Sequence, residues 1–248
     1  MSEKIDRKQL KRPDEFQARA GQAMGWMVAH QRALIIGSGA LAIAIVAVWG
    51  FIAWRSSRES KAGIALAEAL ELQSRPIAGD ASAQPGAETF PSKEERDKAV
   101  LAALEKVRSE NGNTAAANTA QAELGFHKLK AGDAVGAQKE LEDFLRSTSK
   151  DHPLRAFATE SLGYALEAQT RIDEARAAFE RLREAGMPER ADFQRARLDL
   201  LQGKPNAKSE LEKVAKDYPK DPVSMEANQR LELAALPSGP SAATPKQK

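Results

Sequence analysis

The longest uninterrupted apolar stretch of the sequence lies near its N-terminus. It runs from Ala33 to Ala53, holds 21 residues without a charged side chain, and is flanked by Arg32 and Arg55. At about 1.5 Å of rise per residue, such a helix extends ~32 Å, enough to cross a hydrocarbon layer of about 30 Å. We therefore expect residues 33–54 to form a single transmembrane helix in contact with the lipid bilayer.

Two other structures could produce an apolar stretch of this kind. A buried core helix usually shows a polar stripe and is shorter. A cleaved signal peptide has an apolar core of about 7–15 residues behind a short basic leader, whereas here the core has 21 residues and the leader 32. An uncleaved signal anchor fits this pattern better. The chain contains no cysteine, which excludes an anchor through a lipidated cysteine.

The pattern after the apolar stretch predicts helices throughout. Residues 55–75 form a helix-prone lead-in, and residues 76–91 are rich in Pro, Gly, Ala and Ser, as in a flexible linker. Residues 92–236 place apolar side chains at helical spacing. The composition of residues 237–248 indicates a disordered tail. Aromatic residues make up only 5% of the chain, which favours an all-α fold over a β-sandwich.

Capping residues mark several helix starts in the segment 92–236. Ser92 and Glu95 have the spacing of a capping box. Asp133 follows a glycine and can cap the next helix, and Asp221 precedes Pro222, which suits the first helical position. These residues predict separate short helices joined by tight turns.

The helices repeat as pairs. The first pair contains Leu124-Gly125, Ala137 and Leu141, the second contains Leu162-Gly163, Ala175 and Phe179, and a third contains Ala207, Leu211 and Pro219. The first two pairs are 38 residues apart, and their offsets from glycine to alanine and from alanine to the larger residue are 12 and 4. Gly and Ala at such positions allow two helices of a hairpin to cross closely, and we expect Leu141 and Phe179 to fill the gap to the next hairpin.

This spacing resembles the tetratricopeptide repeat. The resemblance implies an all-α architecture in which an N-terminal transmembrane helix is followed by an α-solenoid of helix hairpins. A generic helical bundle is the alternative. The whole layout resembles the ancillary SecYEG translocon subunit family. That resemblance implies a bacterial inner-membrane protein whose repeats lie in the periplasm and associate with translocon subunits, periplasmic chaperones or unfolded client segments.

Charge gives a weaker indication of the orientation. Residues 1–32 carry seven basic and four acidic groups, as in a cytoplasmic tail, although the charges nearest the span do not settle the topology. We expect the N-terminus in the cytoplasm. The remainder of the chain is nearly neutral, which argues against a nucleic-acid partner.

The sequence shows no catalytic or metal-binding motif. The three histidines, His30, His127 and His152, have no metal-ligand spacing, and no phosphate-binding or nucleophile motif occurs in a soluble segment. We expect no enzyme activity, catalytic residue, metal, cofactor or small-molecule substrate. His127 is interpreted as a packing residue.

The repeat resemblance places certain first-helix residues in a concave groove. They are Phe126, Leu129, Phe157, Glu160, Tyr164, Glu167, Asp192 and Asp199. A groove with apolar anchors and an acidic rim would suit extended, basic protein segments. The alternative is that these acidic residues are ordinary solvated side chains.

These observations favour a membrane-anchored scaffold for protein–protein interactions, assisting translocation or chaperoning at the Sec translocon. A second hypothesis is an envelope scaffold or adaptor for cell division or for another secretion complex. A third is a regulator whose cytoplasmic tail binds a partner or anionic lipid. Deletion of residues 1–20 would separate the scaffold from the regulator.

Overall fold

The computed structural model describes residues 15–80, 86 and 88–236, and these residues form helices without any β-strand. The α-helices are α1 (Glu15–Ala29), α2 (Gln31–Ser74), α3 (Lys93–Glu110), α4 (Ala115–Lys130), α5 (Ala134–Ser147), α6 (Arg155–Ala168), α7 (Ile172–Glu180), α8 (Pro188–Leu201), α9 (Ala207–Asp217) and α10 (Pro222–Ala235), and a 3-10 helix η2 (Arg181–Arg183) follows α7. The predicted all-helical fold class is confirmed for this part of the chain. The tail predicted for residues 237–248 lies outside it.

The chain divides into two units, Met1–Ser57 and Arg58–Lys248. The first unit holds α1 and the apolar part of α2. Among the described residues, α2 is the one helix that is long and apolar enough to cross a membrane, with a mean hydropathy of 2.3 in its most apolar window. Within the segment expected to be a basic cytoplasmic tail, residues 15–29 form α1, and their alanine content favours a helix.

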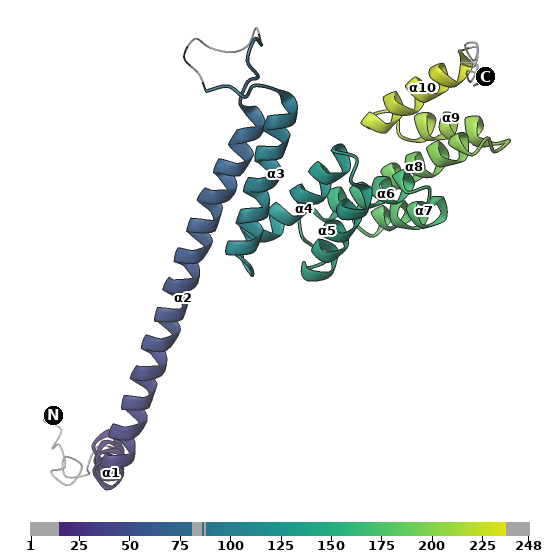
Figure 1. The fold of residues 1–248 in the computed structure, drawn as a ribbon. Coiled ribbons are helices and arrows are strands. Elements are labelled where there is room, and N and C mark those ends of the chain that lie inside the picture. The colour runs from purple at the N-terminus through teal and green to yellow at the C-terminus, as the bar shows by residue number, and fades with distance from the viewer. Residues whose placement is uncertain (1–14, 81–85, 87, 237–248) are drawn as a thin grey trace, which may run out of the picture. The chain divides into compact units, whose positions relative to one another are not determined.

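The second unit is a series of helices in which each packs on the next along the chain from α3 to α10 (Figure 1). In addition α4 packs on α6, and α8 on α10. Its core consists of three apolar clusters. The first joins the end of α2 to α3 and α4, the second joins α4 through α8, and the third joins α8, α9 and α10.

Two glycines allow close helix crossings within the hairpins. A Cβ atom added to Gly125 would lie 2.5 Å from Cγ of Leu141, and one added to Gly163 would lie 2.3 Å from Cε1 of Phe179. The expected close crossing is therefore confirmed in both pairs. Leu141 and Phe179 contact the glycine of their own hairpin. The guanidinium of Arg197 on α8 lies 5.7 Å from the Phe179 ring centroid, so Phe179 also faces the next hairpin, as expected.

The three predicted N-cap residues accept hydrogen bonds at their helix starts. The side chain of Ser92 accepts a hydrogen bond from the Glu95 amide at 3.2 Å, and Asp133 accepts one from Gly136 at 2.8 Å. Asp221 accepts one from the Val223 amide at 2.9 Å at the start of α10. Each bond satisfies an amide that the first helical turn leaves without a partner.

The ends of the segment predicted as a linker are held together. The Ala78 amide donates to the carbonyl of Phe90 at 2.8 Å, and the Phe90 amide donates to that of Pro76 at 3.0 Å. Arg75 forms an ion pair with Glu88 at 2.6 Å. The end of α2 and the start of α3 are therefore joined as a hairpin. Residues 81–85 and 87, on which the prediction of flexibility also falls, lie outside the described residues.

The first residues of the second unit also bind the turn between α3 and α4. The Glu59 carboxylate accepts a hydrogen bond from the Ala115 amide at 2.5 Å, at the N-terminus of α4. A Nη atom of Arg58 donates to the carbonyl of Gly112 at 3.2 Å. An acidic group at a helix N-terminus is stabilised by the helix dipole. The end of α2 is thus part of this folded unit.

Candidate protein-binding surface

The structure brings the predicted apolar anchors of α4 and α6 together. The ring centroids of Phe126 and Phe157 are 5.3 Å apart, within the usual range for an aromatic pair. The ammonium group of Lys130 lies 5.4 Å from the centroid of Phe126. Leu129, like the two rings, is partly exposed. These residues form an apolar patch between α4 and α6, which we call the aromatic patch (Phe126, Leu129, Phe157).

The predicted acidic residues of α6 are already paired with side chains of α8. Glu160 accepts hydrogen bonds from Arg190 at 2.5 Å and from Gln194 at 2.6 Å. Glu167 binds Arg197 through both of its oxygens, at 2.8 and 2.5 Å. Such two-bond arginine–carboxylate pairs are among the stronger hydrogen-bonded contacts in proteins. These acids are therefore already ion-paired within the unit, and their role in binding a basic ligand stays a prediction.

Tyr164 completes this polar contact between α6 and α8. Its hydroxyl accepts a hydrogen bond from Gln194 at 2.5 Å, and the guanidinium of Arg197 lies 5.2 Å from its ring centroid. Burial, together with the negative charge of Glu160, raises the pKa of Tyr164. The tyrosine thus stays protonated and serves as a hydrogen-bonding and stacking group.

The contact continues from α8 to α10. Arg190, which binds Glu160, also forms an ion pair with Glu226 at 2.6 Å. We call this set the ion ladder; it consists of Glu160, Tyr164, Glu167, Arg190, Gln194, Arg197 and Glu226. Arg190, Gln194 and Arg197 were not predicted as site residues. Their spacing of four and three residues, which puts them on one face of a helix, was the available signal.

The ion ladder bridges helices whose backbones stay apart. The Cα atoms of α4 and α6, and those of α8 and α10, approach within 8 Å, whereas those of α6 and α8 do not. Long side chains span this wider interval, and Gln194 and Arg197 are only 0% and 5% exposed. The surface therefore has an apolar half at α4–α6 and an ion-paired half at α6–α8–α10.

The structure does not bring Asp192 and Asp199 to the ion ladder. Asp192 lies two residues from Arg190, roughly 200° around the axis of α8. It binds Arg183 at 2.6 Å and the hydroxyl of Tyr218 at 2.7 Å. Burial alone would raise the pKa of Asp192, but the hydrogen bonds from Arg183 and Tyr218 outweigh it and lower the pKa. The carboxylate therefore fastens α8 to η2 and to the end of α9.

Asp199 lies on the same side of α8 as Asp192. It forms ion pairs with Arg176 of α7 at 2.6 Å and with Lys204 at 2.7 Å. Burial would raise the pKa of Asp199, and the bonds from Lys204 and Arg176 outweigh it, so the pKa is lowered. Asp199 also lines a polar cavity of about 460 Å³ at the turn between α8 and α9. A role of these two aspartates in binding stays a prediction, on a different face from Glu160.

A second charged group, centred on Glu140, was not predicted from the sequence. Glu140 of α5 is 3% exposed and receives hydrogen bonds from Arg108 of α3 at 2.5 Å and from Lys128 of α4 at 2.9 Å. Burial would raise the pKa of Glu140, but the hydrogen bond from Lys128 and the charges of both partners lower it. Its position between the buried Ala137 and Leu141 was a signal that the carboxylate would be enclosed. This group joins three helices.

His127 is buried in α4, as expected of a packing residue. Its Nε2 atom has no hydrogen-bond partner, and the carboxylate of Glu123 lies 3.9 Å away. Burial and the charge of Lys130 lower the pKa of His127, which favours the neutral ring. In the described ranges, no group of three or more histidine or acidic side chains is placed to hold a metal ion.

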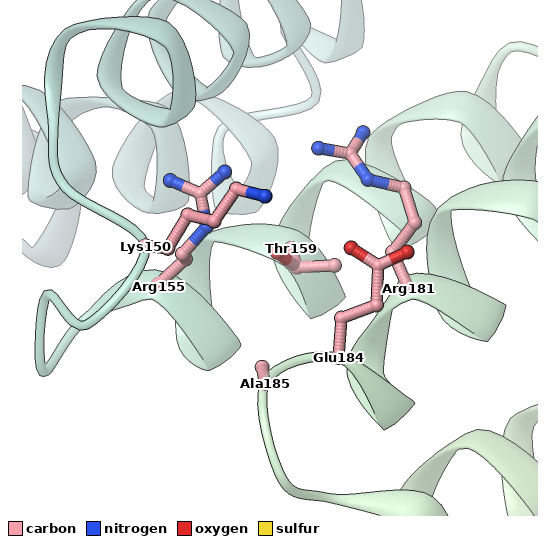
Figure 2. Close-up of a pocket in the computed structure, with 6 residues that line it drawn as sticks. All are labelled: Lys150, Arg155, Thr159, Arg181, Glu184 and Ala185. Atoms are coloured by element: carbon pink, nitrogen blue, oxygen red, sulfur yellow. The ribbon is translucent and has the colours of Figure 1, made fainter.

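A small basic pocket lies where the loop before α6 meets η2 (Figure 2). Lys150 and Arg155 enter it from one side, and Arg181 and Glu184 from the other, with Thr159 between them. Arg155 donates to the carbonyl of Leu145 at 3.0 Å, so it also fastens the loop. The pocket volume is about 40 Å³, far below the ~300–1,000 Å³ of typical ligand pockets.

Comparisons with known proteins do not identify the surface. No family model, curated protein or solved structure matches the chain. The surface must therefore be interpreted from its own geometry. That geometry singles out the aromatic patch as the part of the predicted site whose side chains are partly exposed and not held by ion pairs.

Proposed function

We propose that this protein is a single-pass membrane protein that serves as a scaffold for protein–protein interactions. Its anchor is the apolar part of α2, and its N-terminus is cytoplasmic, with the helical unit in the periplasm of a bacterial inner membrane. The helical unit is a tetratricopeptide-like array, in which the hairpins α4–α5, α6–α7 and α8–α9 follow one another. The resemblance of its layout to ancillary translocon subunits supports a role in translocation or chaperoning at the Sec translocon.

The observation that carries this proposal is the aromatic patch. Phe126 of α4 and Phe157 of α6 pair at 5.3 Å and stay partly exposed, and Leu129 of α4 is partly exposed as well. Paired aromatic side chains on a rigid helical surface are typical anchors of protein interfaces. We expect a partner to place apolar side chains here, and Glu160 and Glu167 to position α8 through the ion ladder.

The test is site-specific crosslinking in intact cells. A photoreactive residue in place of Leu129 would lie within the aromatic patch and keep both phenylalanines, and one in place of the exposed Lys139 on α5 serves as the matched control. We expect adducts with translocon subunits, periplasmic chaperones or secreted clients from position 129 only. Phe157→Ala should reduce these adducts. Equal adducts from both positions would contradict the proposed surface.

The anchor and its orientation need a separate measurement. Alkaline carbonate should leave the full-length chain in the membrane fraction, and protease added to spheroplasts should digest the helical unit while residues 1–32 stay protected. A chain that is extracted by carbonate would contradict the anchor. Protection of the helical unit would contradict the periplasmic location, while leaving the scaffold proposal open to the crosslinking result.

A further inference from the structure

A groove lies between the end of α2 and α3, away from the aromatic patch. Its volume is about 540 Å³, which falls in the range of well-formed binding pockets. The floor consists of Ala65, Ala69 and Leu72 on α2, with Ala103 and Val107 on α3. Ala69 and Val107 are buried, and both belong to the apolar cluster that joins these helices to α4.

The shape of the groove follows from the sequence of its walls. Positions 65, 69 and 72 on α2, and 103, 107 and 110 on α3, are each spaced by four and then three residues. This spacing sets three side chains in a line along one face of a helix, about 10 Å long. Because alanine occupies half of these positions, the two helices leave a trough between them. The hairpin turn at Ile77 and Phe90 keeps the walls together.

The rim of the groove is acidic. Glu68, Glu71 and Glu110 are exposed, and none of them has an ion-pair partner within 4.0 Å among the residues that the structure describes. Arg75 is paired with Glu88, which leaves Lys106 to offset the three carboxylates. The groove therefore combines an apolar floor with uncompensated negative charge.

We propose that this groove binds a cationic amphipathic helix of another protein. The alanines at half of the positions in these two rows leave room for a third helix at the usual interaxial distance of about 8–10 Å. An occupant helix would insert apolar side chains spaced at three and four residues and would place Lys or Arg opposite Glu68, Glu71 and Glu110. A second copy of this chain would bring the same carboxylates against each other, which disfavours a homodimer through this face.

The test uses the full-length chain in nanodiscs of zwitterionic lipid. The sequence has no cysteine, so Lys106→Cys can carry a single environment-sensitive fluorophore at the rim. The probe is a synthetic 18-residue helix with leucines on one face and lysines on both flanks. A peptide with glutamates in place of the lysines, and empty nanodiscs, serve as controls for charge and for binding to lipid.

We expect saturable binding of the lysine peptide and none of the glutamate peptide. Reversing Glu68, Glu71 and Glu110 to lysine should weaken binding by about tenfold, since three exposed ion pairs are lost. The matched control reverses three exposed carboxylates elsewhere in the unit, Asp173, Glu212 and Glu232, and should leave the affinity unchanged.

A groove-filling variant separates the floor from the rim. Ala65→Phe changes no charge and should weaken binding at least as much as the reversed rim, with the helical circular dichroism unchanged. Equal affinity for both peptides, or equal effects of the rim and control reversals, would overturn the proposal. If the fluorescence changed with protein concentration in the absence of peptide, a second copy of the chain would occupy the groove, and the proposal would be overturned as well.

Discussion

The close crossing at Gly163 makes a sharp prediction about stability. A Cβ atom at this position would lie 2.3 Å from Cε1 of Phe179, against an ordinary carbon–carbon contact of about 3.5–4.0 Å. The ring or the helix must therefore retreat by more than ~1 Å. The ring is 1% exposed and its centroid lies 5.3 Å from that of Tyr164, so it has little space to move. Overpacking of this kind costs about 1–3 kcal/mol.

The matched control for Gly163→Ala is Gly63→Ala. Gly63 lies inside α2 within the same unit, and a Cβ atom there would have no neighbour within 4 Å. Both substitutions gain about 1 kcal/mol because alanine favours a helix more than glycine does. That gain cancels in the comparison, so Gly163→Ala should be less stable than Gly63→Ala by about 1–3 kcal/mol.

Thermal unfolding of the full chain in mild detergent measures this difference. All three tryptophans (Trp26, Trp49 and Trp54) lie outside the helical unit, so tryptophan fluorescence would not follow its unfolding. Far-UV circular dichroism is therefore the suitable signal. For a unit of this size, 1 kcal/mol corresponds to about 2–4 °C in Tm. Phe179→Leu should reduce the cost of Gly163→Ala, since a smaller side chain would face the new methyl group. Equal Tm values for Gly163→Ala and Gly63→Ala would refute the reasoning.

Three further predictions concern the charged contacts and the unit boundary. Glu140→Gln should lower the free energy of unfolding by about 1–3 kcal/mol at pH 7. Because folding lowers the pKa of Glu140, this difference in stability should be present above pH ~4.5 and be lost as the pH falls below it. Urea unfolding at several pH values measures it. Arg197→Lys keeps the charge but loses the two-bond contact with Glu167, and should cost about 1 kcal/mol in the same assay. Removal of residues 1–57 should leave the amide hydrogen exchange of α3 slow. Removal of residues 1–91 should accelerate it, because the apolar cluster loses the end of α2. Equal exchange rates in the two truncated chains would contradict the unit boundary after residue 57.

Local features of the fold were predictable from the sequence. Ser92, Asp133 and Asp221 act on amides two or three residues away, so the capping rule needs no knowledge of the tertiary fold. The glycines at 125 and 163 were identified by their repeated spacing. The helix starts and the hairpin crossings therefore follow from residues that act locally.

The candidate site was harder to predict because its partners are distant in sequence. Glu160 and Arg190 are 30 residues apart, and so are Glu167 and Arg197. A helix-by-helix reading cannot show that these acids meet arginines across the wide interval between α6 and α8. It also could not show that Asp192 lies on the other side of α8, since the repeat spacing alone suggested the groove.

The interval between α6 and α8 has a mechanical consequence. Interdigitated apolar side chains resist any change in spacing because their dispersion contacts decay steeply with distance. Ion pairs between long, rotatable side chains decay more gently and can reorient as two helices shift. The array should therefore bend more easily across the ion ladder than across the α4–α6 crossing, while the apolar contacts of α7 with α8 keep the hairpins joined.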